Sequence, residues 1–204
     1  MNLIEKFHSS VIYRRRLKVL AEHLAKLLPQ NASVLDIGSG DGWLAHLIQQ
    51  RRRDLKIHGL DVLIREKTYI PIVPFDGKKI PIENKSADVV MFVDVLHHTD
   101  NPMLLLHEAV RVTRHAVVIK DHTCDGLFAF HTLRFMDEVG NKRYRVALPC
   151  NYWSAEKWRE AFQQVGLIVT NWESKLGLYA FPLNCIFERS LHFIANMALV
   201  TQNE

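Results

Sequence analysis

The hydrophobic pattern changes its period several times along the chain. Between residues 11 and 28 apolar residues recur every three or four positions, which predicts an amphipathic helix that ends before Pro29. Short apolar runs then alternate with segments of helical period. The expected strands cover residues 33–37, 56–61, 70–76, 87–95 and 115–121, and the expected helices cover residues 43–52 and 101–113. This alternation is typical of a parallel sheet with helices on both faces.

The alternation stops after Asp121. Residues 122–152 appear irregular, and they contain the aromatic residues Phe128, Phe130, Phe135, Tyr144 and Tyr152. A helix is expected after the cap residue Ser154, with Lys157 three positions further on. Two late β-like runs follow at 166–175 and 184–199.

No internal repeat or linker indicates a second domain, so we expect one domain over residues 1–204. Its parts are an N-terminal helix (1–29), the alternating half (30–121), the aromatic insert (122–152) and a C-terminal helix with strands (153–204).

Composition sets further bounds on the class of protein. The chain has 204 residues, of which 48% are hydrophobic, enough to form the core of one domain. No run of eighteen apolar residues occurs, and the first residues lack the features of a signal peptide, so we expect a soluble, cytoplasmic protein. Three widely spaced cysteines, an odd number, predict reduced thiols rather than a disulfide framework.

The net charge is +4, and part of the excess of basic residues is concentrated in two arginine triplets, at positions 14–16 and 51–53. Solvated helix faces are the favoured interpretation, and neither triplet has the interleaved aromatic residues of a nucleic-acid groove, so nucleic acid is an unlikely partner. Phe7, Val11 and Tyr13 precede the first triplet. Peripheral membrane contact through residues 7–28 therefore stays open, although packing of this helix on the sheet is favoured.

The segment VLDIGSGDGWLAHL (34–47) carries the clearest chemical signal. Glycines in the first turn between a strand and a helix let the backbone approach a ligand closely, and such turns lie at the edge of the sheet where ligands bind. The third glycine of the dinucleotide motif would fall at Trp43, which argues against NAD, and no phosphate loop of NTPases occurs. Asp36 and Asp61 end the first two strands, a pair that suits a ligand with a ribose and an amino acid but no phosphate.

These segments resemble a known family. VLDIGSGDG, HGLDV and PFDGKKIPIENKSADVVMFVDVLHHTDNP are similar, over roughly residues 30–121, to class I S-adenosylmethionine-dependent methyltransferases, specifically the type 11 small-molecule branch. The resemblance implies an α/β fold with a Rossmann-like, mostly parallel seven-stranded sheet and helices on both faces. It also implies S-adenosylmethionine as the cofactor.

The resemblance assigns five residues to the cofactor site. Asp36, Gly38 and Gly40 would line the methionine part, and Asp61 would bind the ribose hydroxyls through charge-assisted hydrogen bonds. Asp76 would lie near the adenine amino group, although the glycine that usually precedes this acid is missing.

Catalysis of methyl transfer depends mainly on positioning, and a general base adds to it when the acceptor is a hydroxyl or an enol carbon. His97 and His122 follow the fourth and fifth expected strands and are the candidate bases, with a structural role as the alternative. Their spacing does not match a known metal motif, so we expect no metal.

The aromatic insert is expected to cover the substrate, with Phe128, Phe130, Phe135 and Met136 lining an apolar chamber, and completion of the core as the alternative. The sequence thus predicts methyl transfer to a small, hydrophobic or aromatic acceptor. The alternatives are a methyltransferase-fold binding protein without turnover and, disfavoured by Trp43, an NAD-dependent oxidoreductase. Oligomeric state stays open.

Overall fold

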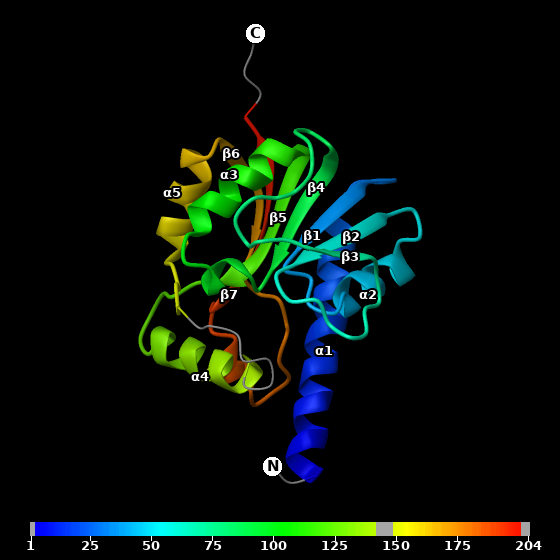
Figure 1. Ribbon diagram of the computed structural model, residues 1–204. Coiled ribbons are helices and arrows are strands. Elements are labelled where there is room, and N and C mark those ends of the chain that lie inside the picture. Colours follow the sequence, from blue (N-terminus) through cyan, green and yellow to red (C-terminus); the bar gives the residue numbers. More distant parts are fainter. Residues whose placement is uncertain (1–2, 142–148, 201–204) are drawn as a thin grey trace.

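The computed structural model describes residues 3–141 and 149–200, and the side chains of residues 11–140 and 149–200. Seven strands form one sheet in the order β3-β2-β1-β4-β5-β7-β6 (Figure 1). Their bounds are β1 Ser33–Ile37, β2 Lys56–Asp61, β3 Ile72–Pro74, β4 Ala87–Val93, β5 Thr113–His122, β6 Leu167–Glu173 and β7 His192–Leu199. Strands β1 to β5 run parallel, and β7 pairs antiparallel with both β5 and β6. The predicted mostly parallel, seven-stranded sheet is confirmed.

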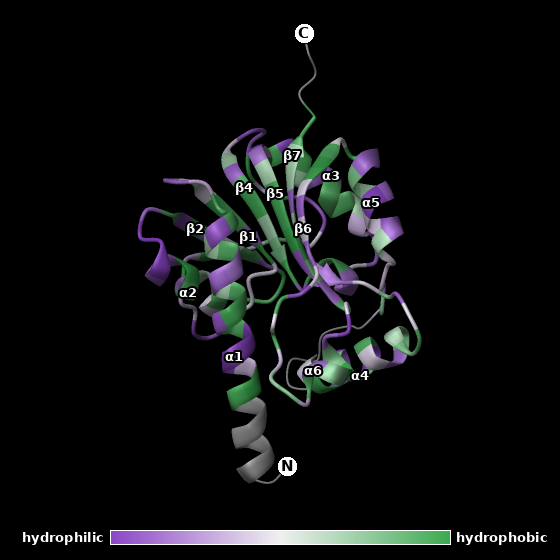
Figure 2. Ribbon diagram, turned by 180° about the vertical axis from the view of Figure 1, so that it is seen from behind, coloured by the Kyte–Doolittle hydropathy of each residue, from purple (hydrophilic) through white to green (hydrophobic). Residues whose placement is uncertain are grey.

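The helices form a layer on each face of this sheet. Their bounds are α1 Leu3–Leu27, α2 Trp43–Arg51, α3 Pro102–Val112, α4 Ala129–Asn141, α5 Ala155–Gln164 and α6 Asn184–Phe187, with a short 3₁₀ helix η1 at Leu96–His98. Helices α1 and α2 pack on one face, and α3 and α5 pack on the other (Figures 1 and 2). Helix α4 belongs to neither layer and lies below the sheet in Figure 1.

The two-sided burial follows from the alternation of side chains along each strand. In β4, Val89 and Met91 pack towards α1 and α2, whereas Val90 and Phe92 pack towards α3 and α5. A central strand buried on both faces is apolar at nearly every position. Figure 2 accordingly shows β4 and β5 mostly in the green of hydrophobic residues.

Polar caps fix where the helices of one layer begin. The Asn101 side chain accepts a hydrogen bond from the Leu104 N–H, and Pro102 occupies the first position of α3, where its missing N–H costs nothing. The Ser154 hydroxyl accepts one from the Lys157 N–H at 3.2 Å, which confirms the cap predicted for α5.

Two predictions about secondary structure were wrong. Residues 122–152 are not irregular throughout, because they contain the thirteen-residue helix α4, which buries Ala129 and Leu133 four positions apart. Of the run 184–199, only residues from His192 onward form a strand, and residues 184–187 form the short helix α6. Tyr144 lies outside the described residues.

Helix α1 begins earlier than the sequence pattern indicated, at Leu3. Its residues Leu17, Leu20 and Leu24 are buried, whereas Val11 and Tyr13 are half exposed. The side chain of Phe7 lies outside the described part, and membrane contact through residues 7–28 stays a prediction. Within the described ranges, no helix has the length and apolar character needed to cross a bilayer.

Candidate functional site

The turn between β1 and α2 is bent by glycines with positive φ. A Cβ added to Gly38, which has a φ of 70°, would lie 2.5 Å from Cγ2 of Val95, so this position has no room for a side chain. Gly40 has a φ of 64°, and a Cβ there would meet no atom within 4 Å. The backbone at Gly40 is therefore open to the space in front of the turn, as a cofactor site requires.

Asp61, the last residue of β2, holds this turn in place. Its Oδ2 accepts a hydrogen bond from the Gly40 N–H at 2.7 Å, and its Oδ1 accepts one from the Leu63 N–H at 2.8 Å. Because an ionised carboxylate has about four acceptor positions, each oxygen keeps the capacity for one hydroxyl of a ligand. Asp61 can thus shape the turn and bind a ribose at the same time.

Asp36 is the second-last residue of β1, on the face covered by α1 and α2, and only 4% of its surface is exposed. Burial, together with the negative charge of Asp61, raises the pKa of Asp36 to about 8. At neutral pH without a ligand, most molecules therefore carry a neutral Asp36 carboxyl. A positively charged group bound beside Asp36 would favour its ionised form.

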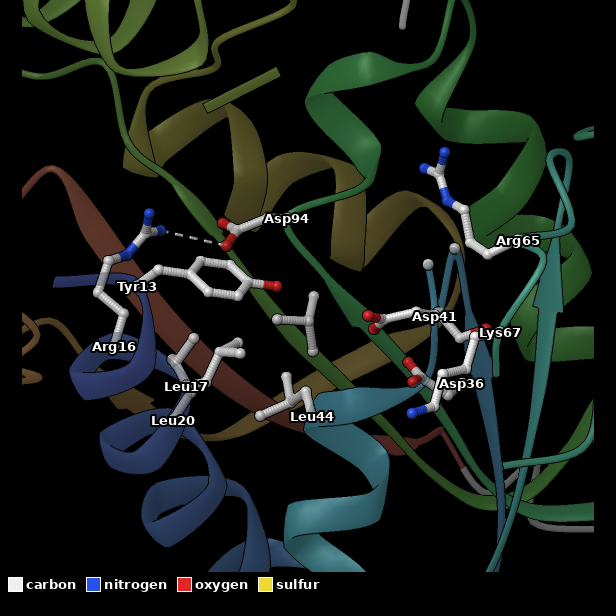
Figure 3. A pocket seen from close by; sticks show the side chains of 14 residues that line it. Tyr13, Arg16, Leu17, Leu20, Asp36, Asp41, Leu44, Arg65, Lys67 and Asp94 are labelled. Atoms are coloured by element: carbon white, nitrogen blue, oxygen red, sulfur yellow. Dashed lines mark ion pairs between the residues drawn. The ribbon is translucent and has the colours of Figure 1, made fainter. Parts of the chain in front are cut away.

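Two adjoining cavities lie in front of the turn. The smaller, of about 420 Å³, is lined by Asp36, Gly38 and Gly40 and by residues of α1 (Figure 3). The larger, of about 540 Å³, shares Gly38 and Gly40 with it. It extends past Asp61, Asp76, His97 and His122. The lining of these two adjoining cavities therefore includes all seven residues predicted from the sequence.

Asp76 lies at the rim of the larger cavity and is exposed. Its Oδ1 accepts hydrogen bonds from the N–H groups of Lys79 and Lys78, both at 2.8 Å, and these bonds lower the pKa of Asp76. The second oxygen faces no described hydrogen-bond donor of the chain. A contact between Asp76 and the adenine amino group stays a prediction.

A charge network in the cavity wall was not predicted from the sequence. Asp94, which follows β4, forms an ion pair with Lys120 of β5, whose side chain is fully buried. Arg16 of α1 adds a second cation, with its Nη2 3.5 Å from Oδ2 of Asp94 (Figure 3). Burial raises the pKa of Asp94, but Lys120 and Arg16 outweigh it and hold that pKa well below the usual range. In the sequence, this network could have been recognised from Lys120, a charged residue inside the apolar run VVIKD.

Arg16 is thus not a purely solvated arginine, in contrast to the favoured interpretation of its triplet. Together with Tyr13 it lines both cavities, and Figure 3 shows the two side chains reaching from α1 towards Asp94. Helix α1 therefore forms one wall of the site as well as covering the sheet.

The two candidate bases differ in their surroundings. His97 is 1% exposed, and its Nδ1–H donates to Oδ1 of Asp121 at 2.6 Å. Burial lowers the pKa of His97, but the Asp121 and Asp137 carboxylates raise it, to about 10. His122 is 3% exposed, with Nε2 at 3.4 Å from Oδ1 of Asp94. Burial and the charge of Lys120 hold the pKa of His122 well below its usual value.

The apolar lining of the observed cavity differs from the aromatic chamber that the sequence predicted. Met136 of α4 lines the larger cavity, but Phe128, Phe130 and Phe135 are 63%, 42% and 55% exposed. These aromatic residues lie on the outer side of the insert, because α4 directs Met136 and Asp137 towards the cavity. Apolar lining comes instead from the sheet side, from Val62, Leu63, Phe75, Val95, Leu104 and Leu105.

Comparison with protein families identifies the class of protein. Residues 12–171 match a family model described as a methyltransferase domain, so this chain belongs to that methyltransferase family. The match includes the glycine turn, both strand-end acids and the strands as far as β6. It confirms the class I S-adenosylmethionine-dependent methyltransferase family inferred from the motifs.

Solved structures confirm the fold at low sequence identity. The methyltransferase bound to the Trm112 activator of Haloferax volcanii has a TM-score of 0.68 and 15% identity, with 95% of this chain and 93% of that chain covered. A SAM-dependent methyltransferase from Aquifex aeolicus has a TM-score of 0.60, 17% identity, and coverage of 94% and 98%. A geranyl diphosphate methyltransferase in complex with SAM has a TM-score of 0.69, 13% identity, and coverage of 90% and 85%. Comparison with curated protein sequences gave no match.

Proposed function

We propose that this protein transfers a methyl group from S-adenosylmethionine to a small acceptor with an apolar body. One observation carries the proposal. Asp36, Gly38, Gly40 and Asp61, from β1, β2 and the turn that follows β1, line two adjoining cavities, and the larger of these also reaches the candidate bases.

Asp61 would bind the ribose hydroxyls with the acceptor capacity left after its bonds to Gly40 and Leu63. Asp36 would lie near the methionine part, where an ammonium group would favour its charged form. Asp76 would take the adenine amino group.

The acceptor would enter the larger cavity. Its apolar lining suits a hydrophobic or aromatic body, and His97 and His122 lie at the strand ends, where the reacting atom of the acceptor would be. The cofactor brings the reactive methyl group, and the chain contributes position and exclusion of water, an effect on the order of 7–11 kcal/mol of the barrier. A base would add to this for a hydroxyl acceptor. A pKa of about 10 keeps His97 protonated at neutral pH, so His122, whose lowered pKa leaves it neutral, would be the base.

The test uses S-adenosylmethionine with an isotopically labelled methyl group and a panel of hydroxyl-bearing aromatic and aliphatic compounds. Mass spectrometry should find labelled product together with S-adenosylhomocysteine. The variant Asp125→Ala loses a carboxylate that holds a backbone N–H outside the cavity, and it should keep the activity that Asp61→Ala loses. Cofactor binding without any labelled product from the panel or from a metabolite extract would favour the binding protein without turnover.

A further inference from the structure

Two histidines and a carboxylate form a compact group in the wall of the larger cavity. His97 and His98 belong to η1, and Asp137 comes from α4. One nitrogen of each histidine and one oxygen of Asp137 lie within 4.8 Å of one another. His97 and Asp137 are 1% and 7% exposed, so the group is shielded from bulk solvent but borders the cavity.

The hydrogen bonds around His97 direct one of its nitrogens into this group. Asp121 accepts the Nδ1–H bond at 2.6 Å and also holds the N–H groups of Leu96 and His122, so the ring is fixed from behind. The other nitrogen, Nε2, points towards Asp137, 3.5 Å from its Oδ2. A carboxylate behind a histidine whose second nitrogen faces a further ligand is the usual outer shell of a metal site.

Two buried nitrogen atoms in this group have no hydrogen-bond partner among the described residues. They are Nε2 of His97 and Nδ1 of His98. Buried polar atoms of native proteins nearly always have a partner, so two such atoms in adjacent residues require an explanation. An ion pair between His97 and Asp137 would account for the first atom but not for the second.

We propose that His97, His98 and Asp137 bind a divalent transition-metal ion of the zinc type. Such an ion takes imidazole nitrogen and carboxylate oxygen at about 2.0–2.2 Å, which places tetrahedral ligand atoms about 3.4 Å apart. The 3.5 Å between Nε2 of His97 and Oδ2 of Asp137 matches this spacing, and any wider pair, none beyond 4.8 Å, has to close by at most about 1.4 Å through side-chain rotation. Two imidazoles select zinc, iron or cobalt over magnesium and calcium, which prefer oxygen ligands.

A neighbouring side chain also orients one of these ligands, as a metal site requires. The Tyr152 hydroxyl donates a hydrogen bond to Oδ2 of Asp137, the oxygen that faces His97, and so fixes the orientation of this carboxylate. Three protein ligands leave a fourth position, which would face the cavity. There the ion would bind an oxygen of the acceptor. This last role rests on the proposed methyl transfer, whereas metal binding itself does not.

Helix α4 explains why sequence spacing predicted no metal. His97 and His98 are adjacent in the chain, but the third ligand lies about forty positions further on, in a segment that appeared irregular. Only the fold of the insert brings Asp137 back to the end of β4.

The test measures metal binding to the chelator-treated protein in the absence of cofactor. Calorimetry with Zn²⁺ should show one tight site per chain, and Co²⁺ should give the intense visible bands of a four-coordinate ion, whereas Mg²⁺ should bind far more weakly. His98→Ala and Asp137→Asn should weaken Zn²⁺ binding at least 100-fold. Asp121→Asn, which removes the outer-shell carboxylate, should weaken it about 10- to 100-fold.

His131→Ala is the matched control, because His131 is an exposed histidine on α4 itself, and this variant should bind Zn²⁺ like the parent. Absence of a tight Zn²⁺ site, or a site unchanged in both His98→Ala and Asp137→Asn, would overturn the proposal. Calorimetry with S-adenosylmethionine on the same samples separates the two ideas. Cofactor binding without metal binding removes the metal site alone, and metal binding without cofactor binding removes the proposed function alone.

Discussion

Replacement of Asp36 by Asn should stabilise the ligand-free protein, by an amount that grows with pH. The pKa of Asp36 rises from 3.8 in the unfolded chain to about 8 in the fold, so the folded state retains a proton that the unfolded state releases. Between these two values the wild type loses stability as pH rises, and above about 8 the loss is complete. The loss amounts to about 2 kcal/mol at pH 5.5 and about 5 kcal/mol at pH 8.5. An asparagine does not ionise, so the variant should escape this loss.

The assay is urea unfolding of both proteins at pH 5.5, 7.0 and 8.5, followed by tryptophan fluorescence. The advantage of Asp36→Asn over the wild type should increase by about 3 kcal/mol from the lowest to the highest pH. Glu160→Gln, an acid-to-amide change at an exposed position of α5, should show a constant and small difference. If the stability advantage of Asp36→Asn over the wild type stays constant with pH, or decreases as pH rises, then burial and Asp61 do not hold this carboxyl neutral.

Two further predictions concern the turn and the charge network. Gly40→Val should abolish cofactor binding but leave a folded domain, because the branched side chain would project into the cavity. The control is Gly166→Val, which imposes the same backbone strain at a φ of 79° but lies away from the cavity. In thermal melts, S-adenosylmethionine should still stabilise this control variant. Equal stabilisation of both variants would reduce Gly40 to a turn residue. Lys120→Met should destabilise the fold by about 3 kcal/mol in urea unfolding, since it removes the buried cation paired with Asp94 and leaves that carboxylate with Arg16 and His122. A loss no larger than that of Lys56→Met, at an exposed position of β2, would contradict this account.

Most of the fold was predictable because the sheet dominates the sequence pattern. Strands buried on both faces are apolar runs, and acidic residues mark their carboxyl ends: Asp61 is the last residue of β2, and Asp36 and Asp121 are the second-last residues of β1 and β5. The grouping of the proposed cofactor residues was predictable for the same reason, since parallel strands bring their carboxyl ends to one edge. Local sequence around each strand end was enough to find Asp36, Gly38, Gly40 and Asp61.

The rest of the site depends on contacts that no local pattern contains. The partners of Asp94 are Lys120 on the neighbouring strand and Arg16 nearly eighty positions earlier. The insert was misread because the aromatic residues of α4, Phe130 and Phe135, are exposed, which hides the helical period that the buried Ala129 and Leu133 follow. Asp137 could therefore be found only after the helix had been placed.

Calorimetry with S-adenosylmethionine tests the central claim most directly. The wild type should bind one cofactor per chain and should not bind NAD. Asp61→Ala should weaken binding by about 1.5–3 kcal/mol, about 10- to 150-fold, because hydrogen bonds to a charged group are lost. Asp125→Ala, the control outside the cavity, should bind like the wild type. Absence of S-adenosylmethionine binding to the wild type, or unchanged affinity in a folded Asp61→Ala variant, would contradict the assignment of this cavity as the cofactor site.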